Sequence, residues 1–222
     1  MHRLSASRGN LGVMALCLAL SDCGAVRSSA DNPLTVGGLT PKIEDKDAGL
    51  VAVAPGLDLK KYKVVVVEKF PVSSAQIEDE GDRRFAEKVT TGLHQQLVRR
   101  LRESGLFQEV VDASATELRS SDVPALRLLG EITRLGRGSQ AARYFAGIYG
   151  AGRARAQADM YFAEIPSGQV VIATADRRVS GGVQWFGGDD EEILTESFDD
   201  MARDLARFLV RLSKGEAPSK LP

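Results

Sequence analysis

The chain has 222 residues, of which 43% are hydrophobic, and its 29 basic and 30 acidic side chains give a net charge of −1 at pH 7. This near-neutral charge argues against a general nucleic-acid binder. The only cysteines are Cys17 and Cys23, so neither a disulfide framework nor a thiolate metal site is expected. Length and hydrophobic content suit one folded domain with a single core.

The first 22 residues have the layout of a cleaved secretory signal peptide. Arg3 and Arg8 give a positive start, and the apolar run from Leu11 to Leu20 is too short to span a bilayer. Removal of residues 1–22 leaves 27 basic and 29 acidic side chains and one histidine, His94. The mature protein is therefore expected outside the cytoplasm.

The residues around Cys23 resemble a bacterial lipobox. Leu20, Ser21 and Cys23 fit that pattern, in which Cys23 would become the acylated first residue, whereas Asp22 stands where a small neutral residue is expected. Gly24 does not resemble an inner-membrane retention signal, so the periplasmic side of the outer membrane is the expected location. The alternative is ordinary cleavage after Ala25 or Ala30, which would give a soluble periplasmic protein.

The mature chain divides into three parts. Residues 23–60 are predicted to be the lipidated N-terminus and a flexible tether, because they are rich in proline and glycine and show no sustained periodicity. An alternative for this segment is a short strand at Leu50–Val53 that packs on the domain. Residues 61–214 are predicted to form a single domain, and residues 215–222 a disordered tail.

The first half of the domain predicts a strand, a long helix and a second strand. Tyr62–Val67 contains four consecutive valines, typical of a central strand. After Asp82, which can cap a helix, apolar residues recur every four positions until Ser104-Gly105. These residues are Phe85, Val89, Leu93, Leu97 and Leu101. Phe107–Val111 predicts the second strand, and Ala113–Ser120 a short helix or loop.

The second half predicts three long strands and a final helix. Strands are expected at Ala125–Leu135, Arg155–Glu164 and Gln169–Ser180, the last two joined in a hairpin by the turn Pro166–Gly168. Apolar residues recur at helical spacing from Ile193 to Leu212. The order β-α-β-β-β-β-α predicts an α+β fold: a four- to five-stranded, mostly antiparallel or mixed sheet with two long helices on one face.

Residues 130–200 resemble the bacterial envelope lipoproteins of the domain of unknown function 4410 group. The resemblance rests on glycines and hairpin spacing, notably Gly130-Glu131-Ile132, Gly138-Ser139, Arg143–Gly147, Gly150–Ala154 and Ser167–Val170. It implies a small α/β envelope domain, and it brings no established catalytic residues. Asp22 departs from the usual leader of this group.

Three features that invite a chemical interpretation have simpler explanations. The glycine-rich segment Gly147–Gly152 precedes a strand rather than opening a helix, so it does not predict a phosphate loop. The acidic run Asp189–Glu192 suits a helix start better than a metal site. His94 is expected on the surface of its helix, with neither a cysteine nor a second mature histidine as partner. The sequence therefore predicts a non-enzymatic protein without cofactor or metal, with a carboxylate-only hydrolase left open.

The remaining feature is a division of charge. Residues 131–180 hold seven arginines against four acids, whereas residues 181–204 hold eight acids against Arg203. The favoured explanation is pairing inside the domain; the alternative is a bipolar surface for self-association or for an oppositely charged partner.

The sequence predicts a protein-docking domain anchored to the membrane through Cys23, with an envelope protein or a second copy as partner and no nucleic acid. The candidate partner or ligand surface consists of arginines and aromatic residues: Arg143, Tyr144, Phe145, Tyr149, Arg153, Arg155 and Trp185. The alternative is a periplasmic small-ligand-binding module, in which Tyr144, Tyr149 and Trp185 would line an enclosed pocket.

Overall fold

The computed structural model describes residues 25–114, 123–136, 155–180 and 190–220. Its elements are, in chain order, β1 (Ala25–Ser28), β2 (Ile43–Asp45), β3 (Gly49–Val53), η1 (Leu59–Lys61), β4 (Val64–Val67), η2 (Ser74–Gln76), α1 (Glu80–Glu103), β5 (Glu109–Asp112), β6 (Ala125–Gly136), β7 (Arg155–Ile165), β8 (Val170–Ser180) and α3 (Asp190–Ser213). From β4 onward, the helices and strands follow the predicted order β-α-β-β-β-β-α.

The strands form one mixed sheet of eight strands in the order β2-β3-β8-β7-β6-β4-β5, with β1 pairing on β8 beside β3. β4 runs parallel to both β5 and β6, and the other pairs are antiparallel. The α+β prediction is confirmed, but the sheet is larger than the predicted four to five strands, because the N-terminal segment contributes three.

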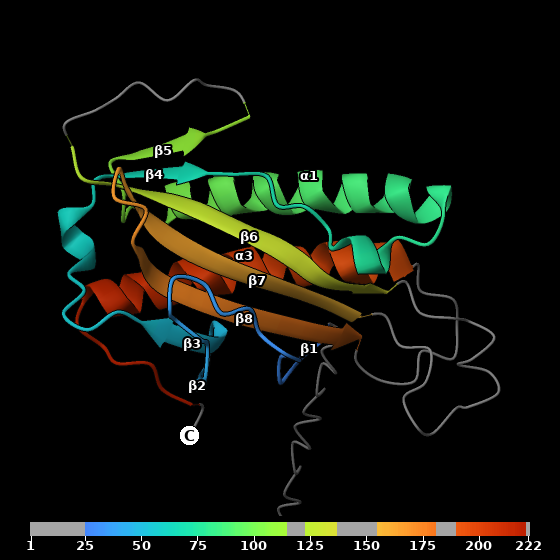
Figure 1. Ribbon diagram of the computed structural model, residues 1–222, viewed down its shortest axis with the longest axis horizontal. Coiled ribbons are helices and arrows are strands. Elements are labelled where there is room, and N and C mark those ends of the chain that lie inside the picture. Colours follow the sequence, from blue (N-terminus) through green and yellow to red (C-terminus); the bar gives the residue numbers. More distant parts are fainter. Residues whose placement is uncertain (1–24, 115–122, 137–154, 181–189, 221–222) are drawn as a thin grey trace, which may run out of the picture.

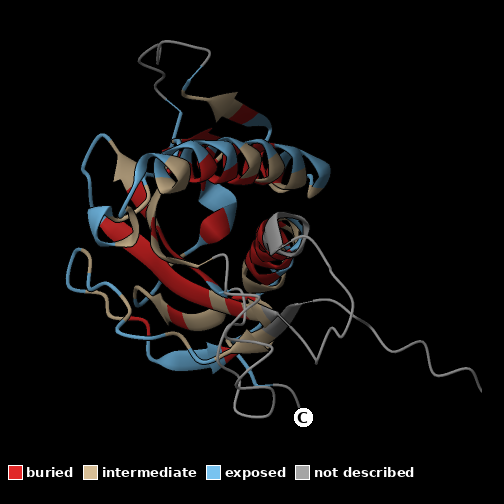
Figure 2. Ribbon diagram, turned by 90° about the vertical axis from the view of Figure 1, so that its right-hand side faces the viewer, coloured by how far each residue is buried: buried red, intermediate tan, exposed pale blue. Residues whose placement is uncertain are grey.

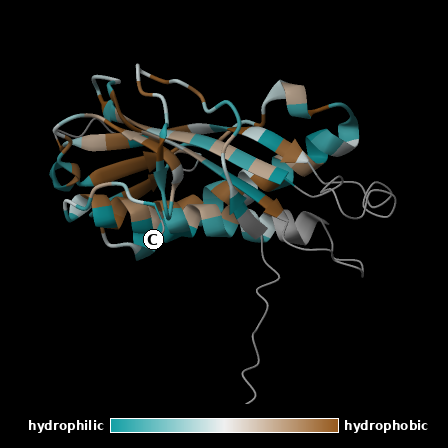
Figure 3. Ribbon diagram, turned by 90° about the horizontal axis from the view of Figure 1, so that it is seen from below, coloured by the Kyte–Doolittle hydropathy of each residue, from teal (hydrophilic) through white to brown (hydrophobic). Residues whose placement is uncertain are grey.

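The two long helices lie side by side against one face of the sheet (Figures 1 and 2). Contacts between residues 96–103 of α1 and residues 198–206 of α3 show that the helices run in the same direction. Their apolar sides pack on the strands in one continuous core, in which Leu97, Leu126, Phe162 and Leu209 are fully buried. In Figure 3 the helices alternate between hydrophilic and hydrophobic residues, as expected for helices that bury one side.

The predicted flexible tether is wrong for the described residues 25–60. β1 pairs with β8 from Ala25 to Ser28, and β3 continues along the same edge of β8. The alternative strand at Leu50–Val53 is confirmed as part of β3. The sequence pattern missed these strands because β1 and β3 are only four and five residues long and are stabilised by pairing with β8, more than 100 positions away.

The predicted disordered tail also differs from the structure. Ser219 accepts a hydrogen bond from the backbone N–H of Lys46 at 2.8 Å and donates its own N–H to Asp45 at 3.1 Å. Lys220 forms an ion pair with Glu44 at 2.9 Å. These contacts hold the described end of the tail beside β2, at an edge of the sheet. Pairing with a distant strand end, rather than local composition, orders this segment.

The predicted termini of the first helix are right at one end. α1 ends at Glu103, with Ser104 as its C-cap and Gly105 in the left-handed region at φ +64°. Its N-cap is Asp79, whose side chain accepts the backbone N–H of Asp82, so the helix begins two residues before the predicted Asp82. The predicted hairpin turn at Pro166–Gly168 is confirmed.

Candidate functional site

Most residues of the predicted partner surface lie outside the described residues. These are Arg143, Tyr144, Phe145, Tyr149, Arg153 and Trp185, together with Cys23 and the segment Gly147–Gly152. Arg155 is described, and it is exposed at the first position of β7. It pairs with Gly136 on one side and with Val179 on the other, so it lies at the end of the sheet where β1 begins.

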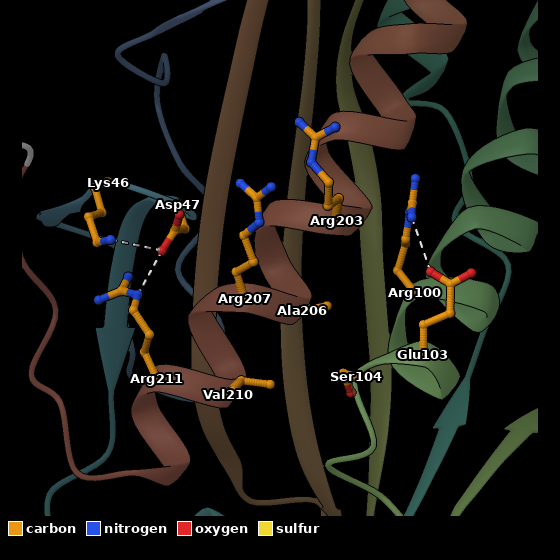
Figure 4. Close-up of a pocket in the computed structure, with 10 residues that line it drawn as sticks. All are labelled: Lys46, Asp47, Arg100, Glu103, Ser104, Arg203, Ala206, Arg207, Val210 and Arg211. Atoms are coloured by element: carbon orange, nitrogen blue, oxygen red, sulfur yellow. Dashed lines mark hydrogen bonds and ion pairs between the residues drawn. The ribbon is translucent and has the colours of Figure 1, made fainter.

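Two surface grooves of the described residues lie along the line where α1 and α3 meet, which we call the helix seam. A groove of about 480 Å³ lies at the end of the seam where the two helices terminate (Figure 4). It is open to solvent, and its walls come from α1, α3 and the turn between β2 and β3. They consist of Lys46, Asp47, Arg100, Glu103, Ser104, Arg203, Ala206, Arg207, Val210 and Arg211.

Acidic neighbours pair with the arginines of this groove. Arg211 contacts both Asp45 and Asp47 at 2.7 Å, and Arg100 contacts Asp199 at 2.8 Å. Burial alone would raise the pKa of Asp45, but hydrogen bonds from Arg211 and from backbone N–H groups lower it below its ordinary value. The groove therefore presents arginine–carboxylate ion pairs rather than a concentrated positive charge.

Arg207 is the most exposed arginine of the groove. Its side chain is 58% exposed and contacts Asp204 at 3.1 Å, and in Figure 4 it extends from α3 beside Arg203. Arg203 in turn contacts Asp200 at 2.6 Å. Both guanidinium groups thus pair with carboxylates of α3 itself and stay partly exposed. Each can therefore also meet a carboxylate of an approaching molecule.

A second groove, of about 540 Å³, lies further along the helix seam. Its floor is formed by the apolar side chains Phe85, Val89, Leu93 and Phe198. Its rim is polar, with Arg84, Glu87, Lys88, Thr91, Gln95, Gln96 and Thr195. Its volume is within the range of small-molecule sites, which are also mostly apolar with a few polar groups. The contacts of Arg99 and Arg100 with Asp199 lie between the two grooves.

Between α3 and the sheet, two arginines and two aspartates form a charge cluster that joins β1, β8 and α3, in which Arg178 and both aspartates are buried. Arg178 contacts Asp176 at 2.7 Å and Asp204 at 2.8 Å, and Arg27 contacts the same carboxylates at 3.4 and 2.9 Å. Burial alone would lower the pKa of Arg178, but the two carboxylates raise it above its ordinary value. Arg27 also donates to the carbonyl oxygens of Lys46 and Asp47.

This cluster bears on the division of charge in the sequence. Arg178 comes from the arginine-rich stretch and Asp204 from the acidic stretch, so this pair matches the predicted pairing inside the domain. Arg177 instead pairs with Asp31, at 2.8 Å, which belongs to neither stretch. Arg137, Arg143 and Arg153 lie outside the described residues, as do the side chains of the acidic run at the start of α3.

The prediction of a surface histidine is wrong for His94. The residue is 5% exposed, and its Nε2 lies 2.8 Å from the Asp112 carboxylate, so it connects α1 to the end of β5. Ser114 donates both its hydroxyl and its backbone N–H to Asp112. These hydrogen bonds, together with that from His94, lower the pKa of Asp112 to about 2. The four-residue steps from buried Thr90 to His94 and on to Val98 are the sequence signal that places His94 on the inner side.

We expect the His94–Asp112 contact to contribute a coupling free energy of about 1–3 kcal/mol to folding, because it joins a buried ring to a carboxylate. The test is a double-mutant cycle of His94→Ala and Asp112→Ala, with free energies of unfolding from urea titrations at pH 7. Additive effects of the two substitutions would contradict a direct contribution of the pair.

The other face of the sheet also buries a carboxylate. Asp159 of β7 is 2% exposed, beside the fully buried Gln157. The segment after β1 covers both, since Gln157 exchanges two hydrogen bonds with the backbone of Asp31, at 2.8 and 2.9 Å; this segment lies in front of the sheet in Figure 1. Burial raises the pKa of Asp159 to about 6, although the amide of Gln157 and the N–H of Leu34 oppose that increase.

This raised pKa predicts a stability change with pH. Because folded Asp159 holds its proton up to about pH 6 while the unfolded side chain loses it near 3.8, Asp159 lowers stability as pH rises from about 4 to above 6. Asp159→Asn is expected to remove about 3 kcal/mol of the stability difference between pH 4 and pH 8. Urea unfolding of both proteins across this range is the measurement; parallel pH profiles would contradict the prediction.

The described residues also bear on the requirements for a membrane-spanning helix and for a metal site. In the parts of the chain that are described, no helix is both long and apolar enough to cross a membrane. Within the same parts, no three His, Cys, Asp or Glu side chains lie together in a way that could hold a metal ion.

No family model matches the sequence, and no curated protein matches it. The resemblance to the domain of unknown function 4410 group therefore rests on the residues quoted above alone. Among solved structures, the PelC dodecamer from Paraburkholderia phytofirmans is similar over 70% of this chain and 98% of that chain, with 14% sequence identity and a TM-score of 0.43.

Two other solved structures are also similar, with TM-scores of 0.48 and 0.29. A Xanthomonas campestris protein with the family model DUF330 covers 79% of this chain and 95% of its own, with 11% identity and a TM-score of 0.48. A minor lipoprotein from Acinetobacter baumannii covers 69% of this chain and 94% of its own, with 15% identity and a TM-score of 0.29. The solved structures to which this chain is similar thus include a bacterial lipoprotein, at low sequence identity and with TM-scores below 0.5.

Proposed function

We propose that this chain is a cell-envelope lipoprotein, anchored through acylated Cys23 on the periplasmic side of the outer membrane, whose α+β domain docks a protein partner without catalysing a reaction. The observation that carries the proposal is the position of Cys23. It directly follows the signal-like segment, and it stands two residues before the first strand of the folded domain. A lipid on this residue would confine the domain to the membrane and raise its effective concentration for a partner there.

The helix seam supports docking of a protein at this domain. The groove at the end of the two helices carries arginine–carboxylate ion pairs around the small apolar side chains Ala206 and Val210. Such an arrangement suits a partner surface with complementary charges, which sets orientation and association rate. An envelope protein or a second copy of this chain can supply such a surface.

The anchor is tested by the intact mass of the protein in the membrane fraction. The wild-type chain is expected to begin at Cys23 and to carry an acyl mass, and Cys23→Ser is expected to lose this mass and to leave the membrane fraction. A mature wild-type chain that begins after Ala25 or Ala30 without lipid would overturn the anchor.

Docking is tested by site-specific photo-crosslinking in cells. A photoreactive residue at Arg207, in the groove of the helix seam, is expected to give a discrete adduct that is lost when Cys23→Ser is added. The matched control is Lys60 of η1, which is also exposed but lines neither groove of the seam. Equal adducts at both positions, or none at Arg207, would contradict docking at the seam.

The second candidate is binding of a small ligand, and the apolar floor and 540 Å³ volume of the groove near Phe85 and Phe198 favour it. Native mass spectrometry of the protein purified from its own cells separates the two functions. A molecule that stays bound in native spectra and is absent after denaturation supports the ligand, and a native mass equal to that of the acylated monomer alone contradicts it.

A further inference from the structure

From the position of β1, we infer that the lipid anchor holds the folded domain directly against the bilayer, with the end of the sheet that carries Arg155 facing the phospholipid headgroups. This inference rests on the proposed lipidation of Cys23. It concerns what the domain contacts once it is anchored.

The chain between the anchor and the sheet is too short to act as a spacer. Ala25 is the first residue of β1 and pairs with Ser180 of β8. Only Gly24 stands between Ala25 and Cys23. Even a fully extended chain spans at most about 3.6 Å per residue, so Cys23 lies within about 7 Å of the sheet. The flexible tether predicted for residues 23–60 therefore does not separate the anchor from the sheet.

β1 is also bound firmly to the sheet, so it does not detach and lengthen the connection between the anchor and the domain. Its four residues pair with Arg177–Ser180. Arg27, in its centre, contacts Asp176 at 3.4 Å and Asp204 at 2.9 Å, carboxylates that are 1% and 6% exposed as residues. Detaching β1 would remove Arg27, which contacts both of these buried carboxylates, and this is strongly unfavourable.

The register of the sheet identifies which end faces the membrane. Ala25 pairs with Ser180, Val179 pairs with Arg155, and Arg155 pairs with Gly136, so the ends of four strands lie together near the anchor. The hairpin turn with Ser167 is at the opposite end of β7, a strand of 11 residues. At about 3.3 Å per residue this places the turn roughly 35 Å from Arg155.

The anchored end carries one exposed arginine that can bind phospholipid headgroups. Arg155 is exposed, and a guanidinium offers several N–H donors in a planar arrangement that matches phosphate oxygens. The end is not basic as a whole, because the exposed acids at residues 78–80 lie beside it, where Gln76 accepts the N–H of Leu135. The orientation therefore follows from the short connection between Cys23 and β1, and Arg155 is the headgroup contact that this orientation makes available.

The test measures how close three positions lie to the headgroups. Because acylation blocks the thiol of Cys23 and Cys17 is removed with the signal peptide, a single introduced cysteine is the only free thiol. Arg155→Cys, Ser167→Cys and Lys42→Cys are purified as full-length lipoproteins, labelled with a fluorophore and reconstituted in phosphatidylethanolamine–phosphatidylglycerol vesicles that contain a nitroxide on some headgroups. We expect several-fold stronger quenching at position 155 than at position 167.

Insertion of ten glycine and serine residues between Gly24 and Ala25 is the matched control, and it is expected to reduce quenching at position 155 to the level at position 167. Equal quenching at 155 and 167 without the insertion would overturn the inference, as would strongest quenching at position 42 on the β2 edge. The intact mass of each sample separates the two proposals. A lipidated chain with equal quenching overturns this inference alone, and an unlipidated chain overturns the anchor as well.

Discussion

Replacing Arg178 with methionine is expected to lower the free energy of unfolding by about 3–5 kcal/mol, because it removes a buried cation and leaves its partners buried. Arg178 is 5% exposed as a residue, Asp176 1% and Asp204 6%. The guanidinium donates to Asp176 at 3.0 and 2.7 Å and to Asp204 at 2.8 Å. Without it, Asp176 keeps only the longer contact with Arg27, at 3.4 Å, among the ion pairs of the described residues, although Asp204 still pairs with Arg27 and Arg207.

The matched control for this substitution is Arg207→Met. Arg207 contacts the same Asp204 at 3.1 Å, but its side chain is 58% exposed, so the loss is expected to be at most about 1 kcal/mol. Urea unfolding followed by circular dichroism measures both variants under the same conditions. Equal losses in the two variants would show that burial of the cluster does not determine its contribution.

Gly49→Ala is expected to lower the free energy of unfolding by about 2–4 kcal/mol, through backbone strain and a steric overlap together. Gly49 begins β3 with φ +72°, where an L side chain is strained. A Cβ at this position would overlap the carbonyl oxygen of Ala175 and lie 3.1 Å from the Cα of Asp176. The added methyl group therefore displaces β3 from β8 beside the buried charge cluster.

Gly56→Ala separates the two causes of this loss. Gly56 has the same φ of +72°, but a Cβ there would have no atom within 4 Å. Its replacement is expected to cost about 1–2 kcal/mol from strain alone. Thermal and urea unfolding of both variants give the comparison, and a loss at Gly49 that matches the loss at Gly56 would contradict the steric overlap.

The parts of the fold that the sequence predicted are those with strong local patterns. Four consecutive valines located β4, and the four-residue apolar steps from Phe85 to Leu101 located α1. By contrast, β1, β2 and β3 are too short to show a period, and their pairing with each other or with β8 decides their structure. Segments whose stability comes from tertiary pairing leave little trace in local composition.

The candidate site was less predictable than the fold. Arg178 and Asp204 belong to stretches whose opposite charges suggested internal pairing, but no local pattern showed that Arg27 would join them from 149 and 177 positions away, by its bonds to Asp176 and Asp204. The helix seam depends on how α1 and α3 lie against each other, which periodicity does not specify. His94 was recoverable from its spacing to Thr90 and Val98, because that spacing places it with buried residues.

The long separation between β1 and its partners has a consequence for the order of events if the chain is exported as proposed. β1 would leave a translocation channel early, whereas Ser180 and Asp204 would follow it by more than 150 residues. β1 would then have no strand to pair with until almost the whole chain had crossed, and contacts of such high sequence separation form late in folding. Under the proposed lipidation, cleavage and acylation at Cys23 would therefore precede the pairing of β1 with β8.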